Sequence, residues 1–453
     1  MWVVDLIFFT ATSLLLVLVL WSSIGEREKR AAILTAIGIV VNSGLWLLFI
    51  LGPENRLVEI LNLLIVICLA LFAALSLLRF FPRREARDMG NSSQFDERNH
   101  MFSRNNLQFH PHLASDYYAR HPEKRETDRE IQNKPELGEP GSLFFDPWYS
   151  SAAEAAFGYL ACTRTAACGT AAVRKQKIDP VTLTDIVCQL GRYYGAVDVG
   201  VTRLKPYHLY SHAGRRAENW GERIVNSHAY AVVMVVVMDI GMIRQAPSVG
   251  VLLESSRQYV ESAKIANITA EYLRLLGFEA RAHTDGNYET MCVPLAVEAG
   301  LGELGRMSLL MHRQYGPCVR LAVVTTDAPL VPSEKKKLFI EEFCRLCQKC
   351  ADNCPSRAIT AGEEPVGRGF RHWSTDQEKC YGFWKKVGTD CGVCIRACPY
   401  TKPNTLFHRM VRFYISRNPL NQKIALFFDD LLYRRLVRIS TRNRRQIWNR
   451  QSR

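Results

Sequence analysis

Four cysteines crowd one short stretch of the chain, Phe343 to Ile359, which reads FCRLCQKCADNCPSRAI. They are separated by two, two and three residues, and a proline follows the last of them. This spacing matches the cysteine run that holds iron–sulfur clusters in bacterial ferredoxins. The four cysteines are Cys344, Cys347, Cys350 and Cys354. The stretch therefore predicts electron-transfer chemistry, one electron at a time.

A second motif, CGVCIRACP, supplies three more cysteines but lacks one of the usual upstream cysteines, for which Cys380 is the evident substitute. In the ferredoxin run the fourth cysteine serves the other cluster. We therefore assign one [4Fe–4S] cluster to Cys344, Cys347, Cys350 and Cys398. The other is assigned to Cys380, Cys391, Cys394 and Cys354. Zinc fits this pattern poorly, because its four ligands commonly come as two separated pairs.

Three polar stretches upstream have the composition of site loops. They are Arg203 to Arg216 (RLKPYHLYSHAGRR), Ala282 to Met291 (AHTDGNYETM) and Glu298 to Leu310 (EAGLGELGRMSLL). Glycines in the third stretch would allow the backbone to approach a large ligand closely. Its spacing does not fit a dinucleotide fingerprint or a P-loop. Each stretch could also be an ordinary connection.

The chain begins with three apolar stretches, at about residues 2–23, 31–51 and 57–81. Each has roughly the 20 residues that a helix needs to cross a bilayer. Basic residues follow the first and third stretches (GEREKR and RFFPRREAR), whereas GPENR between the second and third has one. The excess of basic residues marks the cytoplasmic side. We expect a multi-pass inner-membrane protein with its N-terminus outside.

The soluble part is expected in the cytoplasm, because clusters of thiolates need a reducing compartment. Residues 82–141 are polar and predict an irregular linker. From residue 142 to about 332, amphipathic stretches alternate with buried β-branched runs such as HAYAVVMVVVMD, which indicates an α/β body. We place the cysteine module at residues 333–403 and a basic helical tail at residues 404–453.

Several blocks in fixed order resemble the corrinoid-dependent reductive dehalogenases. They are VVMVVVMD, APS, RQY, LRLLGFEA, the stretch PLAVEAGLGELGRMSLLMHRQYGPCVRLAVVTTDAPL, the cysteine run and FFDDLLY. The resemblance covers about two-thirds of the chain, and the epoxyqueuosine reductases share the same core more loosely. It implies a nitroreductase-like α/β core that binds a cobamide, joined to a two-cluster ferredoxin-like module. The expected fold is therefore three transmembrane helices, this core and this module.

The resemblance also implies roles for individual residues. Reduced cobalamin would cleave a carbon–halogen bond of an organohalide, and a tyrosine would donate the proton. We map that tyrosine to Tyr210, with Tyr207 as runner-up, and its cationic partner to Lys264 or, second, to Arg257. The residues expected to bind the cobamide are Tyr207, His283, Asp285, Gly286, Asn287, Gly300, Gly302, Gly305 and Arg306.

Two departures leave the substrate open. Respiratory members of the family usually carry a twin-arginine signal and act outside, whereas this chain has its own spans and is expected to face inward. The loop HTDGNYETM also differs from the common dehalogenase version. The alternatives are a cobamide reductase of a non-halogenated substrate, as in the epoxyqueuosine branch, and a membrane electron-transfer subunit. The electron donor would be cytoplasmic or membrane-bound.

The formal net charge is +14 over 453 residues, and the segment from Pro403 to Arg453 contributes twelve basic and two acidic residues to it. The last part, RRLVRISTRNRRQIWNRQSR, interleaves basic and apolar residues. Contact with anionic lipid is the most economical interpretation, because the spans already hold the chain at a membrane. A solvated tail is the alternative of similar weight. A nucleic-acid partner is not expected.

Overall fold

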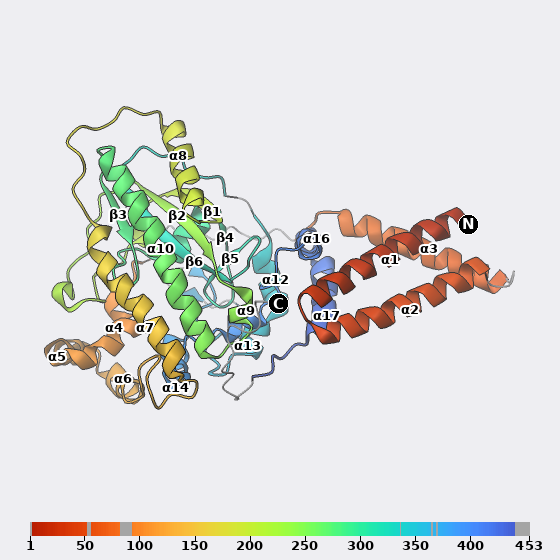
Figure 1. Ribbon diagram of the computed structural model, residues 1–453, viewed down its shortest axis with the longest axis horizontal. Coiled ribbons are helices and arrows are strands. Elements are labelled where there is room, and N and C mark those ends of the chain that lie inside the picture. Colours follow the sequence, from red (N-terminus) through yellow and green to blue (C-terminus); the bar gives the residue numbers. More distant parts are fainter. Residues whose placement is uncertain are drawn as a thin grey trace. The chain divides into compact units, whose positions relative to one another are not determined.

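The structure is a computed structural model that describes residues 2–51, 56–81, 93–335, 337–363, 366–367 and 370–439. The chain forms two compact units. The first combines Met1–Glu85 with Lys402–Leu436, and the second combines Ala86–Thr401 with Val437–Arg453. The C-terminal helices therefore belong with the N-terminal helices, although the body of the second unit lies between them in sequence (Figure 1).

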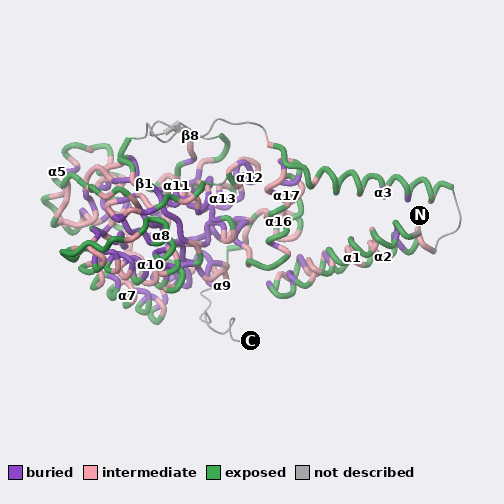
Figure 2. Tube along the Cα trace, turned by 90° about the horizontal axis from the view of Figure 1, so that it is seen from above, coloured by how far each residue is buried: buried purple, intermediate pink, exposed green. Residues whose placement is uncertain are grey.

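Three apolar helices dominate the first unit: α1 (Trp2–Gly25), α2 (Lys29–Leu51) and α3 (Arg56–Leu77). Each is long and apolar enough to cross a membrane, by length and composition. Large apolar side chains are exposed along all three, as the green colour of α3 in Figure 2 illustrates. The helices match the three predicted stretches, except that α3 ends at Leu77 and not at Phe81.

Two further helices, α16 (Leu406–Ile415) and α17 (Pro419–Tyr433), complete this unit. Thr405 and Asn418 cap their N-termini, and Pro419 occupies the first turn of α17, where a missing N–H costs nothing. They occupy the first part of the segment predicted as a basic helical tail. Residues 440–453, which carry much of the predicted lipid-binding charge, lie outside the described residues.

The second unit starts with short helices where the sequence predicted an irregular linker. They are α4 (Met101–Asn106), α5 (Pro111–Arg120) and α6 (Arg125–Gln132), with single 3₁₀ turns between them. Residues 82–92 of the predicted linker are outside the described part. A buried ion pair of 2.5 Å between Arg104 and Asp128 joins α4 to α6. Because charged residues carry these contacts, the segment has no apolar period that would reveal its helices.

A four-stranded antiparallel sheet forms the centre of the second unit. Its strands are β1 (Asp198–Arg203), β2 (Tyr230–Val237), β6 (Val319–Thr326) and β3 (Ala280–His283), in that order. On β2, Val233 pairs with Gly200 of β1 and Val323 of β6. Strand β2 reads as a continuous apolar run because both of its faces are buried. Helices and strands alternate as predicted, in an antiparallel arrangement.

Helices cover both faces of this sheet. On one face lie α8 (Pro180–Tyr193) and the long α10 (Val249–Leu275), and α7 (Pro147–Cys162) packs on α10. On the other lie α11 (Cys292–Glu298) and the hairpin of β4 (Gly302–Leu304) and β5 (Leu310–His312). Gly277 follows α10 with a positive φ of 85°, which confirms the predicted helix end.

The cysteine module follows the sheet. Its helices are α12 (Ile340–Cys347), α13 (Lys349–Asp352), α14 (Gln377–Val387) and α15 (Val393–Ala397). A short α9 (Ile240–Ile243) contacts α15, and a two-residue hairpin, β7 (Val366–Gly367) with β8 (Phe370–Arg371), lies between α13 and α14. Tight turns with positive φ at Gln348 and Gly392 begin α13 and α15. These turns let closely spaced cysteines converge.

Candidate functional site

The eight motif cysteines form two groups. The thiol of Cys398 has Cys344, Cys347 and Cys350 as its electrostatic neighbours. The thiol of Cys391 has Cys394, Cys380 and Cys354. Burial, followed by these neighbours, raises the pKa of both thiols. Among the described residues, no three His, Cys, Asp or Glu side chains converge closely enough to hold a single ion. Cys350 also has Cys394 as a neighbour, so the two groups adjoin; apart from this contact, their members are those of the two predicted ligand sets.

The isolated cysteine, Cys380, lies on α14, and the segment ahead of the core contacts this helix. Arg104 on α4 donates to Glu378 at 2.8 Å, and Lys124 reaches the same carboxylate at 2.9 Å. The backbone N–H of Met101 donates to the side chain of Gln377 at 3.1 Å. These contacts hold the first turn of α14, two to three residues before Cys380.

The last turn of α14 has a second set of contacts. The ammonium group of Lys385 is fully buried and lies 2.5 Å from Glu136. The ring of Phe102 packs edge-on against Tyr381 and Trp384, with ring centroids 5.0 Å apart for Tyr381 and 5.9 Å apart for Trp384. The polar segment that the sequence predicted as a linker therefore acts as a brace for the helix that carries Cys380.

A polar cluster connects the second cysteine group to the core. Arg320 on β6 donates to the Ser255 hydroxyl at 2.6 Å and to Asp390 at 3.0 Å. The same guanidinium lies 3.4 Å from the hydroxyl of Tyr259 on α10, and 4.8 Å above its ring. Asp390 immediately precedes Cys391 in the chain. One arginine thus links a tyrosine of the core to the residue that precedes a predicted cluster ligand.

The environment of this cluster keeps the tyrosines protonated. The positive charge of Arg320 favours ionisation of Tyr259, but burial and nearby acidic groups outweigh it, so the pKa of Tyr259 is raised. Burial also raises the pKa of Tyr288 well above its ordinary value. Both side chains keep some accessible surface, so space remains beside them. A neutral tyrosine with a neighbouring cation can donate a proton and stabilise the phenolate that results.

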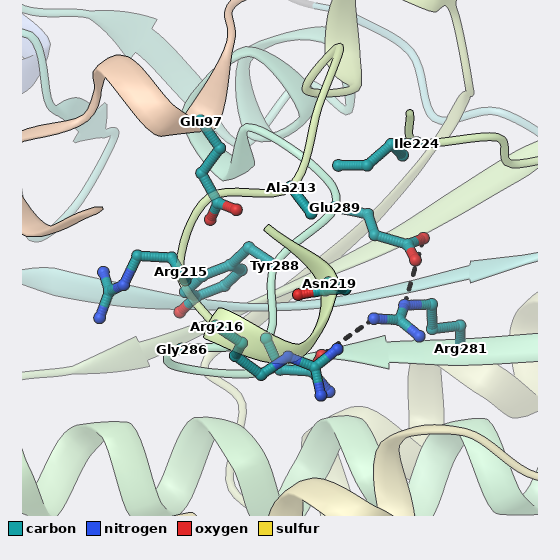
Figure 3. A pocket seen from close by; sticks show the side chains of 11 residues that line it. Glu97, Ala213, Arg215, Arg216, Asn219, Ile224, Arg281, Gly286, Tyr288 and Glu289 are labelled. Carbon is teal, nitrogen blue, oxygen red and sulfur yellow. Dashed lines mark hydrogen bonds and ion pairs between the residues drawn. The ribbon is translucent and has the colours of Figure 1, made fainter. Parts of the chain in front are cut away.

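A pocket of about 280 Å³, a volume that includes open solvent, lies next to this cluster (Figure 3). Its walls come from the segment after β1, from the loop after β3 and from Glu97. Arg281 projects into it between Glu289, at 3.2 Å, and Asn287, at 3.0 Å. Tyr288 lines the pocket and is also an electrostatic neighbour of Tyr259 and Arg320. The pocket and the polar cluster are therefore parts of one site.

Several buried donors around the site have no hydrogen-bond partner within the described part of the chain. They are Nε of Arg215, Nε of Arg320, Nε1 of Trp220 and the hydroxyl of Thr284. An orphaned buried donor costs free energy, so such groups normally bind water or a ligand. The atoms are suited to a large ligand with several hydrogen-bond acceptors, such as the amide- and phosphate-bearing periphery of a cobamide.

Comparison with known proteins finds matches for the cysteine module and for a longer part of the chain. Residues 343–402 match the 4Fe–4S dicluster domain. The tetrachloroethene reductive dehalogenase of Desulfitobacterium hafniense is 37% identical over 210 residues, which are 44% of this chain and 38% of that protein. The tetrachloroethene reductive dehalogenase of Sulfurospirillum multivorans is 32% identical over 288 residues, which are 56% of this chain and 57% of that dehalogenase. About half of this chain is similar to the reductive dehalogenases.

The fold of this chain is similar to that of solved structures. A catabolic reductive dehalogenase in complex with 3-bromo-4-hydroxybenzoic acid superposes with a TM-score of 0.64 at 22% identity, covering 80% of this chain and 50% of that one. The epoxyqueuosine reductase of Lactococcus garvieae is a more distant relative, 27% identical over 27% of this chain and 38% of that protein. The chain spans less than two thirds of the curated dehalogenases that it matches. The nitroreductase-like description of the core stays a prediction.

The glycine block of this chain, Gly300 to Gly305, has a different neighbour from the one expected. A Cβ on Gly300 would lie 2.6 Å from the carbonyl oxygen of Glu334, and one on Gly302 would lie 2.3 Å from that of Met311. A Cβ on Gly305 would contact the Met311 side chain at 2.6 Å. These glycines permit close packing of the chain on itself, and they do not line the pocket of Figure 3.

Arg306, predicted to bind the cobamide, is buried at the cysteine module. It donates to the carbonyl oxygens of Cys344 at 3.2 Å, Thr360 at 2.9 Å and Gly362 at 2.7 Å. Its guanidinium stacks 4.4 Å from the Trp373 ring. Burial lowers its pKa, although the neighbouring thiols oppose that shift. Arg306 thus ties the glycine block to the first cysteine group, because its long side chain reaches three backbone oxygens there.

The loop after β3 divides into packed and accessible residues. His283 is buried, and its two ring nitrogens lie 2.9 Å from the Thr325 hydroxyl and 3.2 Å from the Glu289 N–H. Burial lowers its pKa well below the ordinary value. Gly286 and Asn287, which the sequence predicted to bind the cobamide, line the pocket. Asp285 is an electrostatic neighbour of both Tyr259 and Tyr288.

The predicted proton donor and its partner are not brought together by any contact among the described residues. Tyr210 forms a β-bridge with Phe95, and their rings lie 6.2 Å apart. Lys264 pairs with Glu261 on the exposed face of α10, and Arg257 pairs with Glu254 on the same helix. Tyr207 is buried, and its hydroxyl accepts from Lys205 at 3.2 Å.

Sequence reasoning missed the cluster of Tyr259, Arg320 and Asp390. Two signals were present in the printed sequence. Tyr259 ends the RQY block, and Arg320 is a charged residue within the otherwise apolar strand VRLAVVTTD. A charged side chain on a buried strand normally forms an ion pair or has a functional role. The third residue, Asp390, could be found only from its contact with Arg320.

Proposed function

We propose that this chain is a membrane-anchored reductive dehalogenase that uses a cobamide and two [4Fe–4S] clusters to cleave a carbon–halogen bond of an organohalide. The observation that carries the proposal is the linkage of Cys391, Asp390, Arg320 and Tyr259. It supports the proposal because the predicted ligand set of the second cluster would lie next to a protonated tyrosine, in a chain similar to reductive dehalogenases. Reductive dehalogenation requires both: R–X, two electrons and one proton give R–H and a halide ion.

Each cluster would be held by one of the two cysteine groups. The first would use Cys344, Cys347, Cys350 and Cys398, and the second Cys380, Cys391, Cys394 and Cys354. Thiolates are the usual ligands of such clusters. The thiols that neighbour Cys398 and those that neighbour Cys391 support this crossed assignment.

The cobamide would lie in the site that contains the pocket of Figure 3, next to Gly286, Asn287 and Asp285. Arg215, Arg281 and the orphaned donor of Thr284 would meet its polar periphery. When bound, a cobamide supplies a reduced cobalt that can break a carbon–halogen bond. Gly300, Gly302, Gly305 and Arg306 would act at a distance, by fixing the core to the cysteine module.

The chain's own residues would manage the proton. Tyr259 would donate from its hydroxyl, because its raised pKa keeps it protonated at neutral pH. Arg320 would stabilise the phenolate, and Ser255 and Asp390 would hold Arg320 in place. Tyr210, with Tyr207 second, stays the alternative donor, and Lys264 its predicted partner.

The anchor would be the three helices α1–α3, with the N-terminus outside the inner membrane and the catalytic unit in the cytoplasm. Electrons would then come from a cytoplasmic or membrane donor. The apolar length of the helices and the basic residues Arg27, Lys29 and Arg30 after α1 support this orientation.

Metal analysis of the purified full chain, expressed with cobalamin, tests the cofactors. We expect about eight iron atoms and one cobalt per chain, with EPR signals of reduced clusters and of a cobalt(II) corrinoid. Halide release from a panel of haloaromatic and haloalkene compounds, with a chemical reductant, tests the reaction. Iron without cobalt would overturn the cobamide and leave an electron-transfer subunit. Cobalt reduction without halide release would favour a non-halogenated substrate.

A further inference from the structure

The two C-terminal helices of the first unit present apolar side chains to the outside. On α16 the exposed residues are Leu406, Met410 and Phe413, and on α17 they are Leu420, Phe427, Phe428 and Leu431. Their spacing of three, four and seven residues places them along one side of each helix. Phe427 is 64% exposed and Phe413 is 53% exposed. A surface of large apolar side chains needs a partner.

Both helices are fixed to one end of the three apolar helices. The imidazole of His408 on α16 lies 2.5 Å from the carboxylate of Glu26, in the turn between α1 and α2, and both groups are buried. Helix α17 packs against α2. The contacts involve the end of α1 and the turn that leads into α2, so they lie at the end of the bundle that is expected to be cytoplasmic.

The third apolar helix makes contacts at the same end. The side-chain amide of Asn418 donates to the carbonyl oxygens of Leu75 and Leu78 at 3.1 Å, and that of Asn421 donates to the carbonyl oxygen of Ser76 at 2.9 Å. The last carbonyls of a helix have no partner within the helix. Helices α16 and α17 therefore begin where all three apolar helices meet the expected membrane surface.

The charge of this segment suits an anionic surface. Residues 402–436 contain seven basic and two acidic residues. Some of the basic side chains lie along aromatic rings: the Arg417 guanidinium is 3.9 Å from the Phe413 ring centroid, and the Lys402 ammonium is 3.3 Å from that of Tyr433. Side chains with apolar stems and charged tips are favoured where hydrocarbon meets headgroups.

We propose that α16 and α17 form an in-plane platform that binds the anionic cytoplasmic surface of the bilayer, with the exposed apolar residues at the boundary between headgroups and acyl chains. The proposal rests on the proposed membrane anchor, since the anchor brings the platform to that depth. It adds a lipid-contacting element to the three spans and moves lipid contact from the terminal basic tail to the helices ahead of it.

Photo-crosslinking of the full chain in lipid nanodiscs tests the platform. The photoreactive p-benzoylphenylalanine is introduced separately at Phe427 and Phe413, at Val40 on α2 as the control for the span, and at the exposed Tyr193 on α8 as the control for the second unit. Nanodiscs contain phosphatidylcholine alone or mixed with phosphatidylglycerol. Mass spectrometry then measures lipid adducts and protein adducts at each position.

We expect lipid adducts at Phe427 and Phe413 in a yield at least about five-fold above that at Tyr193. A five-fold difference corresponds to about 1 kcal/mol, which is the contribution of one basic residue near an anionic surface. Phosphatidylglycerol should raise this yield, and the double variant Arg409→Gln/Lys423→Gln should reduce the increase. Arg313→Gln in the second unit is the matched control.

Two outcomes overturn the proposal in different ways. Lipid adducts at Val40 with only protein adducts at Phe427 and Phe413 would show that a second chain or the soluble unit covers the platform, while the anchor stands. Absence of lipid adducts at Val40 would remove the anchor itself, and the platform with it.

Discussion

Asp390 and Arg320 form an ion pair of 3.0 Å, although 70 residues separate them in the chain. Asp390 is bonded through the backbone to Cys391, and Arg320 also lies 3.4 Å from the Tyr259 hydroxyl. The pair joins the region expected to carry electrons to the group expected to supply the proton. A change at Arg320 should therefore affect turnover without removing either cofactor.

The variant Arg320→Lys tests this relationship. Lysine keeps the charge but loses the planar fork that contacts Ser255, Asp390 and Tyr259 together. Halide release should fall by about 10²-fold or more, as on loss of a donor that stabilises developing charge, with iron and cobalt contents unchanged. Arg313→Lys is the control, since Arg313 makes an exposed ion pair with Asp198. Activity equal to that of the control would exclude a role for Arg320 in turnover.

Removal of the Tyr259 hydroxyl should stop proton delivery. Tyr259→Phe should lose about 10²- to 10⁴-fold in the rate of halide release and keep the ability to be reduced. Because the pKa of Tyr259 is raised, this tyrosine stays protonated until the pH exceeds its ordinary range, near 10. The pH–rate profile should show no loss from its ionisation below that range. Tyr193→Phe, on the surface, is the control; a comparable loss in Tyr210→Phe alone would transfer the role to Tyr210.

The crossed cluster assignment makes a prediction about Cys354. Cys354→Ser and Cys380→Ser should damage the same cluster, lower iron from about eight towards about four atoms per chain, and have matching EPR spectra. Cys350→Ser should damage the other cluster. Cys168→Ser is the control, because Cys168 is exposed and lies outside both groups. A spectrum of Cys354→Ser that matches Cys350→Ser would contradict the assignment.

The brace on α14 should influence the second cluster from a distance. Glu136→Gln leaves the buried Lys385 ammonium without its carboxylate partner. Because Glu136 is partly exposed, we expect a modest loss of about 1–3 kcal/mol in the free energy of unfolding, and a change in the reduction potential or EPR line shape of the cluster that uses Cys380. Lys379→Gln, which removes an exposed ion pair on the same helix, is the control. An unchanged spectrum would limit the brace to a structural role.

The Glu26–His408 pair should make the first unit sensitive to acid. Burial opposes ionisation of Glu26, but the hydrogen bond and charge of His408 outweigh it and lower its pKa from 4.5 to about 2. A lowered pKa stabilises the folded state fully above pH 4.5, and this contribution is lost as the pH falls towards 2. At about 1.36 kcal/mol per pKa unit, the lowering from 4.5 to about 2 contributes about 3 kcal/mol.

Thermal unfolding of the chain in nanodiscs, followed by the circular dichroism of its helices, measures this effect. Glu26→Gln should lower the free energy of unfolding at pH 7. It should also flatten the dependence of this free energy on pH between about 5 and about 3. Glu28→Gln, in the same turn, is the matched control. A wild-type curve as flat as that of Glu26→Gln would show that the pair adds no stability.

Local pattern in the sequence was sufficient for several features. The spacing of Cys344, Cys347, Cys350 and Cys354 indicated iron–sulfur chemistry, because ligands on one short segment must be close in space. The three apolar stretches indicated α1–α3, since length and hydropathy alone decide whether a helix can span a bilayer. The same holds for the buried strand β2 and for the end of α10 at Gly277. The resemblance to reductive dehalogenases rested on blocks of this kind and is confirmed.

Contacts between distant residues were decided only by the tertiary structure. The glycines of GLGELGR proved to lie against Glu334 and Met311 of the chain itself, because a glycine in the sequence permits a close approach without naming what approaches. The helices of the brace were hidden because ion pairs make many of their contacts with α14, and few apolar residues such as Phe102 add to them. Arg320 and Tyr259 are 61 residues apart and meet only because β6 packs on α10. The sequence determined which chemistry the chain carries; the packing of the sheet, α10 and the cysteine module decided which residues share its site.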